Sequence, residues 1–168
     1  MACQTITSIL RGCDGNIGGI TNVYINDLAN VTAITEDAAT WEITAMTVSS
    51  DFKAFEFLRN TSSYVEEDQR DLVAGSNFVR ATITLVFSRR EAAKSKAIKI
   101  LGEGQRDLAV IVKDANGKFW YFPYAQLATV TEGSGTAKAD GSKYNITLVA
   151  ENENLAYEVD SAVIPTII

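Results

Sequence analysis

The sequence predicts a mainly β fold with one α-helix, an antiparallel β-sandwich or half-barrel flanked by that helix. Two observations carry the prediction: several short segments alternate apolar and polar residues, and one segment, 88–102, has apolar residues at helical spacing. A chain of 168 residues, 46% of them hydrophobic and 21% charged, fits one domain with a sizeable core. Residues 1–168 are therefore expected to form a single domain.

The first half of the chain supplies short strands separated by polar turns. The stretch 11–19, with four glycines together with Asp14 and Asn16, is typical of a turn. The predicted strands that follow cover 20–25, 31–35, 41–48 and a segment that begins at Phe55. In the third of these, Trp41, Ile43 and Ala45 are expected on one face of the strand.

A polar stretch near 59–79 predicts either a long antiparallel hairpin or a long loop that joins paired strands. Its middle, 64–71, is acidic. Beyond it, Arg80, Thr82 and Thr84 alternate with apolar residues in the clearest strand pattern of the chain. The apolar set is Val79, Ala81, Ile83, Leu85 and Phe87. A solvated hairpin tip and an interaction arm are both consistent with the polar stretch.

The segment 88–102 is the one convincing helix. Ser88 and Glu91 have the spacing of a capping box, and Gly102 is a good C-terminal stop. A narrow apolar stripe is predicted to face the sheet, and it consists of Ala93, Ala97, Ile100 and Leu101. The other faces of the helix are basic. They are either exposed to solvent or in contact with an acidic neighbour.

The second half returns to strands, predicted at 108–112, 119–122, 127–131 and 144–150. The Asn116–Gly117 pair predicts a tight hairpin turn between the first two. Small residues at 133–141 predict a loop. The chain ends in an apolar arm near 159–168, which has little reason to be exposed in a monomer and is expected to dock on its own chain or on a neighbour.

Composition argues against catalysis. The chain has no histidine, which is the usual general acid or base and the commonest metal ligand. We identify no catalytic residue, no cofactor-binding residue and no metal ligand, and we expect a protein that is not an enzyme. Its two cysteines, Cys3 and Cys13, are most simply free thiols, with a bridge between them as the alternative.

Charge and hydropathy restrict the partners. A net charge of −6 is unsuited to gripping nucleic acid, because affinity for DNA comes largely from Lys and Arg on phosphates. No stretch approaches the ~18–20 apolar residues of a membrane span. Residues 1–10 have no positive region and no long apolar run, so no signal peptide is expected.

In their order, these elements resemble the major tail tube protein of tailed bacteriophages, and most closely the structural proteins of phages and prophages of Bacteroidetes hosts. The resemblance spans most of the chain. It rests on Cys13-Asp14, on the Gly-Gly-Ile and Tyr-Ile residues of 18–25, on 28–32, on the helix at 91–101, and on the strand and turn at 108–120.

The resemblance implies a subunit that forms hexameric rings, whose sheets join into a continuous barrel and whose rings stack into a tube. It implies a virion protein of the phage tail, assembled in the cytoplasm of the host bacterium, with itself and other tail proteins as partners. DNA would pass through the lumen without specific binding. Two alternatives remain: another β-sandwich virion protein (head decoration, head–tail joining or baseplate), and a small-ligand-binding or enzymatic β-barrel.

We predict that the acidic arm meets the basic helix of another subunit, because their charges are complementary. The candidate interface residues are Glu66, Glu67, Asp68, Asp71, Arg89, Arg90, Lys94 and Lys96. A sheet face rich in Thr, Ser, Asn and acids is expected to line the lumen. The face of Arg80, Thr82 and Thr84 is disfavoured for that role, since Arg80 makes one end basic.

Overall fold

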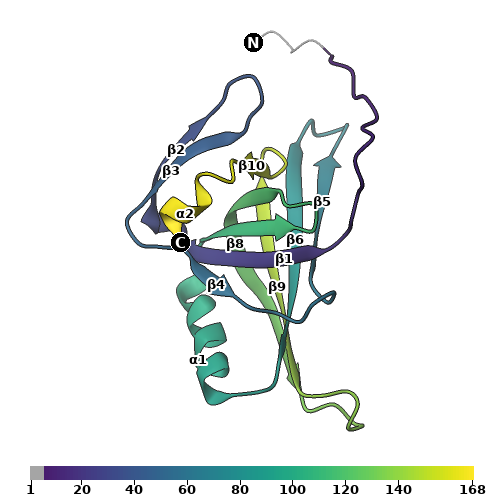
Figure 1. Ribbon diagram of the computed structural model, residues 1–168, viewed down its shortest axis with the longest axis vertical. Helices are drawn as coiled ribbons and strands as arrows, with labels where there is room; N and C mark the ends of the chain where they lie inside the picture. The colour runs from purple at the N-terminus through teal and green to yellow at the C-terminus, as the bar shows by residue number, and fades with distance from the viewer. Residues whose placement is uncertain (1–5) are drawn as a thin grey trace.

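The computed structural model describes residues 6–168 and contains a ten-stranded mixed sheet with one main helix (Figure 1). The mainly β fold is thereby confirmed. The strands are β1 (Ile20–Asp27), β2 (Val31–Glu36), β3 (Ile43–Val48), β4 (Lys53–Phe55), β5 (Ser63–Arg70), β6 (Asn77–Ser88), β7 (Leu108–Asp114), β8 (Phe119–Gly133), β9 (Lys143–Asn152) and β10 (Tyr157–Val159). The helices are α1 (Ala92–Leu101) and α2 (Ile164–Ile167), with 3-10 turns at Leu28–Asn30 and Glu103–Gln105.

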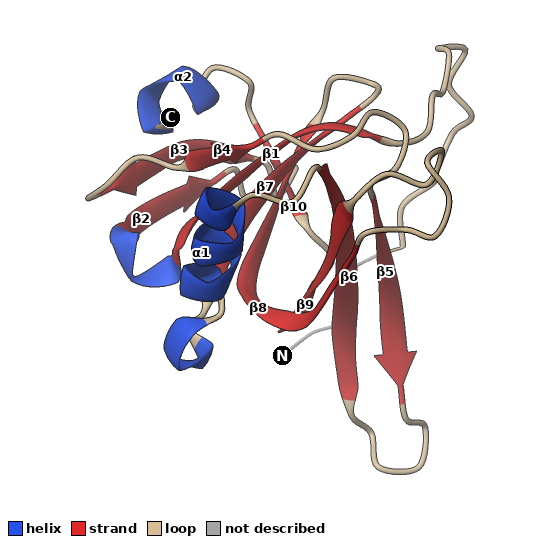
Figure 2. Cartoon of the chain, turned by 90° about the horizontal axis from the view of Figure 1, so that it is seen from below, coloured by secondary structure: helices blue, strands red, loops and turns tan. Residues whose placement is uncertain are grey.

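Strand β8 organises the sheet because it changes partners along its length. Its first residues pair with β7 on one edge and β10 on the other, whereas Ala125–Gly133 pairs with β9. The path β5-β6-β9-β8-β7-β1-β4 is antiparallel throughout, and β10, β3 and β2 extend the sheet from the start of β8. Figure 2 shows the resulting curve of the sheet, with α1 beside β8.

Two apolar clusters lie on opposite faces of β1, β7 and β8. The larger fills the concave side, where Ile98 and Leu101 of α1 meet β6, β8 and β9. The smaller lies behind β7 and is covered by β3 and α2. Because β7 has a cluster on each face, its residues Leu108–Val112 are all buried, and this explains their continuous apolar run.

The strongest local patterns are confirmed. Val79, Ala81, Ile83, Leu85 and Phe87 are all buried on one face of β6. The polar stretch before them is an antiparallel hairpin rather than a loop, since β5 pairs with β6 from Ser63 to Arg70. The Asn116–Gly117 turn joins β7 to β8, with Gly117 at a φ of 88° that favours glycine.

The predicted capping box is wrong. Ser88 stays in β6, where it pairs with Lys143 of β9, and the helix begins only at Ala92 with Glu91 as its N-cap. The hydroxyl of Tyr144 holds this helix start, 3.2 Å from the Glu91 N–H and 2.6 Å from Ser95 Oγ. The helix does end at Gly102, as expected. A Cβ at Gly102 would lie 2.8 Å from Leu127 Cδ2, so a larger residue there would require the Leu127 side chain to shift.

The predicted apolar stripe of α1 is confirmed for Leu101 and wrong for its other three residues. Ile98 and Leu101 face the core, whereas Ala93, Ala97 and Ile100 are exposed. Alanines bury little area, so the larger Ile98 decides which face of the helix packs against the sheet.

The expected face of β3 is also wrong. Ile43 and Met46 are buried, while Ala45 is exposed and Trp41 is 48% exposed. A β-bulge explains the difference: β2 pairs with Ala45 and then directly with Ile43, so Thr44 is an extra residue and the alternation reverses there.

The segment 127–131 is not a separate strand but part of the 15-residue β8. The C-terminal arm packs on its own chain. It forms β10, which pairs with β3 and β8, and then α2, whose Ile164 and Ile167 are buried in the smaller cluster. The Phe52 N–H donates to the Ile167 carbonyl at 2.8 Å and fixes the end of the arm.

Candidate assembly interface

Strands β5, β6, β9 and the second half of β8 form a four-stranded sheet whose convex face is open to solvent. The directly paired residues Ser63, Thr84, Thr147 and Thr129 make a row of hydroxyl side chains straight across it. The next row is Val65, Thr82, Val149 and Gln126. The middle of this face is therefore uncharged, and most of its side chains carry a hydroxyl group.

Arg80 does not make this face basic, which corrects the reason for disfavouring it. Its guanidinium bonds Glu151 Oε1 across the β6–β9 pair, with Nε at 2.9 Å and Nη2 at 2.5 Å. On the other side of Arg80 lies its strand partner Glu67. The charged row at this end of the sheet thus holds one cation between two carboxylates.

Both outer edges of the four-stranded sheet lack a strand partner within the described residues. β5 pairs only with β6, and β8 has no partner opposite β9 once its pairing with β7 ends at Ala125. Unpaired edges present rows of N–H and C=O groups to solvent and are templates for pairing with another strand.

The carboxylates predicted for the interface have different surroundings. Glu66 points to the concave side and accepts the Ala156 N–H at 2.7 Å; burial raises the pKa of its carboxyl, and this hydrogen bond partly opposes the rise. Asp68 binds Arg70 at 2.6 Å. Glu67 lies on the convex face and is exposed.

Asp71 shapes the hairpin tip. Its Oδ1 accepts the N–H groups of Val73 at 2.8 Å and Ala74 at 2.9 Å, and these bonds lower the pKa of the Asp71 carboxyl, with Ala74 the larger cause. The tip is therefore an ordered turn.

The predicted basic residues lie at the start of α1. Arg90 binds Glu132 of β8 at 2.7 Å, and Arg89 and Lys94 both approach Glu91, at 3.4 and 3.8 Å. Lys96 is exposed on the helix. The Arg89 side chain is 83% exposed, against 46% for Arg90.

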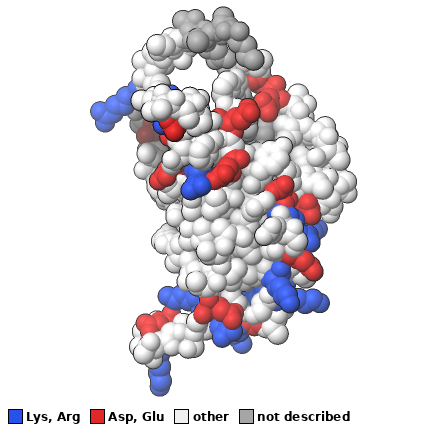
Figure 3. Space-filling model, turned by 180° about the vertical axis from the view of Figure 1, so that it is seen from behind, with Lys and Arg blue, Asp and Glu red and all other residues white. Residues whose placement is uncertain are grey.

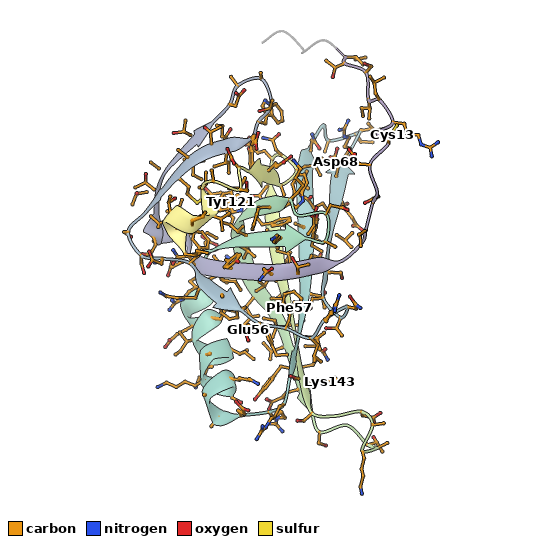
Figure 4. The ribbon with its side chains drawn as sticks, viewed as in Figure 1. Cys13, Glu56, Phe57, Asp68, Tyr121 and Lys143 are labelled. Carbon is orange, nitrogen blue, oxygen red and sulfur yellow. The ribbon has the colours of Figure 1, made fainter. Side chains whose placement is uncertain are left out.

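The structure does not bring the acidic and basic groups together within one chain. They lie at opposite ends of β6, whose 12 residues span about 36 Å. Figure 4 shows this separation through Asp68 of β5 at one end of the sheet and Lys143 of β9 near the other. In Figure 3 the Lys and Arg side chains gather toward the end that carries α1. Any contact between the two sets must therefore join two molecules.

Ligand and metal chemistry have little support among the described residues. A surface hollow of about 420 Å³ lies between Trp41, Asp68 and Trp120, but Asp68 is engaged by Arg70, and the Trp120 indole N–H donates to Asp114 at 3.0 Å. Within residues 6–168, no three His, Cys, Asp or Glu side chains lie together as metal ligands. No helix in this part of the chain is long and apolar enough to cross a membrane. Cys13 is an exposed free thiol, and Cys3 lies outside the described residues.

Sequence reasoning missed three features of this surface: the hydroxyl row, the free edge of β8, and the exposed Leu72–Val73 pair at the hairpin tip. Only the last has a local signal, since two apolar residues stand inside a polar turn. The chain matches no protein-family model, and it has no match among curated proteins.

Proposed function

We propose that this protein is a self-assembling tube subunit, a structural virion protein of the phage-tail type whose rings make a channel for DNA. The observation that carries the proposal is the four-stranded sheet with two free edges, β5 and the second half of β8. Such edges are normally covered or blunted in a protein that stays monomeric. Pairing between copies would cover both at once.

The strand directions support closure into a ring. Each neighbouring pair among β5, β6, β9 and β8 is antiparallel, so β5 and β8 run in opposite directions. Rotation about an axis parallel to the strands preserves those directions. The β5 edge of one copy would therefore meet the β8 edge of the next in antiparallel pairing, and the contact is heterologous, as a closed ring requires.

The convex face of this sheet is our proposed channel wall. Uncharged side chains, most of them with a hydroxyl group, fill its middle, and Arg80 is held by Glu151. DNA is retained by cations that release counterions from its phosphates, and this face offers no free cluster of them. A duplex would pass along such a wall without being held. The partners are then other copies of this chain and other tail proteins, in the virion.

A proline in the β5 edge tests the proposal. The Val86 N–H donates to Ser62, so Val86 directs its backbone groups toward β5. Backbone groups of alternate residues along β6 point the same way, so the N–H and C=O groups of Arg80 also point toward β5. The backbone groups of its partner Glu67 therefore point toward β6. The N–H of Asp68 therefore points to the free edge.

Asp68→Pro removes that N–H, whereas the control Asp68→Asn keeps it and loses only the ion pair with Arg70. We expect rings or tubes in negative-stain microscopy for the wild type and for Asp68→Asn, and folded monomers for Asp68→Pro. A wild-type protein that sediments as an 18.2 kDa monomer at all concentrations contradicts the proposal. Binding of that monomer to a preformed capsid would instead favour a decoration protein.

A further inference from the structure

The tip of the β5–β6 hairpin displays two apolar side chains that touch nothing in the described chain. Leu72 is 94% exposed and Val73 is 99% exposed. They are held in place, because Asp71 caps the turn and Gly75 adopts a φ of 71° within it. Figure 2 shows the hairpin projecting beyond the body of the molecule. An ordered, projecting apolar pair is a feature of elements that insert into a partner.

The exposed face of α1 carries a matching apolar stripe. Ala93, Ala97 and Ile100 are exposed and follow one another at helical spacing, so they lie on one side of the helix. Ile98 and Leu101 occupy the core-facing side. The small alanines leave a shallow strip between longer side chains, which suits two aliphatic groups.

The hairpin tip and the α1 stripe lie among charges of opposite sign. The hairpin segment 63–76 carries four carboxylates and one guanidinium, a net charge of −3. The segment 88–101 carries five cations and one carboxylate, a net charge of +4. Lys96 and Lys99, next to the stripe, have no ion-pair partner among the described residues. The hairpin tip and the α1 stripe are therefore complementary in both their apolar side chains and their charge.

We propose that the hairpin tip of one copy docks on the α1 stripe of a second copy, with Leu72 and Val73 over Ala97 and Ile100. The contact joins opposite ends of the molecule, so it repeats head to tail and does not close on a pair. It rests on the proposed self-assembly and adds a second direction to it: edge pairing closes a ring, and the tip contact links one ring to the next. The two contacts together generate a tube.

Disulfide trapping tests the contact. In a Cys3→Ser, Cys13→Ser background, Val73→Cys and Ala97→Cys in the same chain should give a ladder of dimers and higher oligomers after mild oxidation with oxidised glutathione. The matched control combines Val73→Cys with Ser161→Cys, an exposed serine before α2. It should give dimers at most. Rings in the microscope with no ladder beyond the control overturn the tip contact and leave the ring proposal intact. A ladder without rings supports the tip contact and contradicts ring closure.

Charge reversal is the second measurement. Glu67→Lys and Lys96→Glu should each weaken stacking by about tenfold at low salt, and less at high salt, because exposed charges are screened. The two reversals in one chain restore opposite signs across the contact and should recover stacking. Glu56→Lys, a reversal at an exposed acid outside both segments, is the control and should stack like the wild type. If the double variant stacks no better than the single ones, the charge pairing is wrong.

Discussion

Substitution of Ile167 tests whether the C-terminal arm packs on its own chain. The Ile167 side chain is 1% exposed and lies in the smaller apolar cluster with Phe52 and Ile164. The sequence leaves open whether this arm docks on its own chain or on a neighbour. The structure places it on its own chain, so Ile167→Ala should destabilise the isolated monomer.

The expected loss in the free energy of unfolding follows from the buried carbon groups that Ile167→Ala removes. Ile→Ala removes three carbon groups, worth about 0.8 kcal/mol each, or about 2.4 kcal/mol together. The cavity left behind adds to this, so about 3 kcal/mol is expected, within the usual range for buried Ile→Ala changes. For a domain of this size that loss lowers the melting temperature by about 6–12 °C.

The adjacent residue supplies the control. Ile168 is 50% exposed, and Ile168→Ala should change the free energy of unfolding by no more than about 0.5 kcal/mol. The assay is thermal and urea unfolding at dilution where sedimentation shows monomers only. If Ile167→Ala melts within about 2 °C of the wild type and yet fails to assemble, the arm packs on a neighbouring copy and the reasoning is refuted.

Three further predictions concern other parts of the chain. Burial raises the pKa of Glu66 above its ordinary value of 4.5, so the folded state binds that proton more tightly than the unfolded state. The free energy of unfolding should therefore fall as the pH rises above 4.5, and Glu66→Gln should remove that part of the slope in urea titrations at pH values on both sides of 4.5. Tyr144→Phe removes the hydroxyl that holds Glu91 and Ser95, so hydrogen exchange should accelerate in the first turn of α1 but not in β9; equal acceleration in both would point to a general loss of stability. Assembled protein should not retain duplex DNA in a low-salt filter assay, and tight, salt-sensitive retention would contradict a neutral channel wall.

Patterns that lie within one segment could be predicted from the sequence. The alternation from Val79 to Phe87 predicts which face of β6 is buried, because successive side chains of a strand point to opposite sides. The Asn116–Gly117 turn is equally local, since glycine accepts the positive φ that the turn requires. These signals determined that the chain is a β protein with hairpins.

Pairings between distant segments could not be predicted, because no local rule records them. Ser88 has a helix-capping signature, yet pairing with Lys143 keeps it in a strand. Arg80 is a cation in a strand pattern, yet Glu151 holds it from 71 residues further along the chain. The same holds for the candidate interface: the sequence alone determined which residues are acidic, basic or apolar, but only the tertiary structure put the acidic set beside the first half of β6 and the basic set beyond its last residue. The physical reason is that composition fixes the sign of a charge, whereas strand pairing fixes its position.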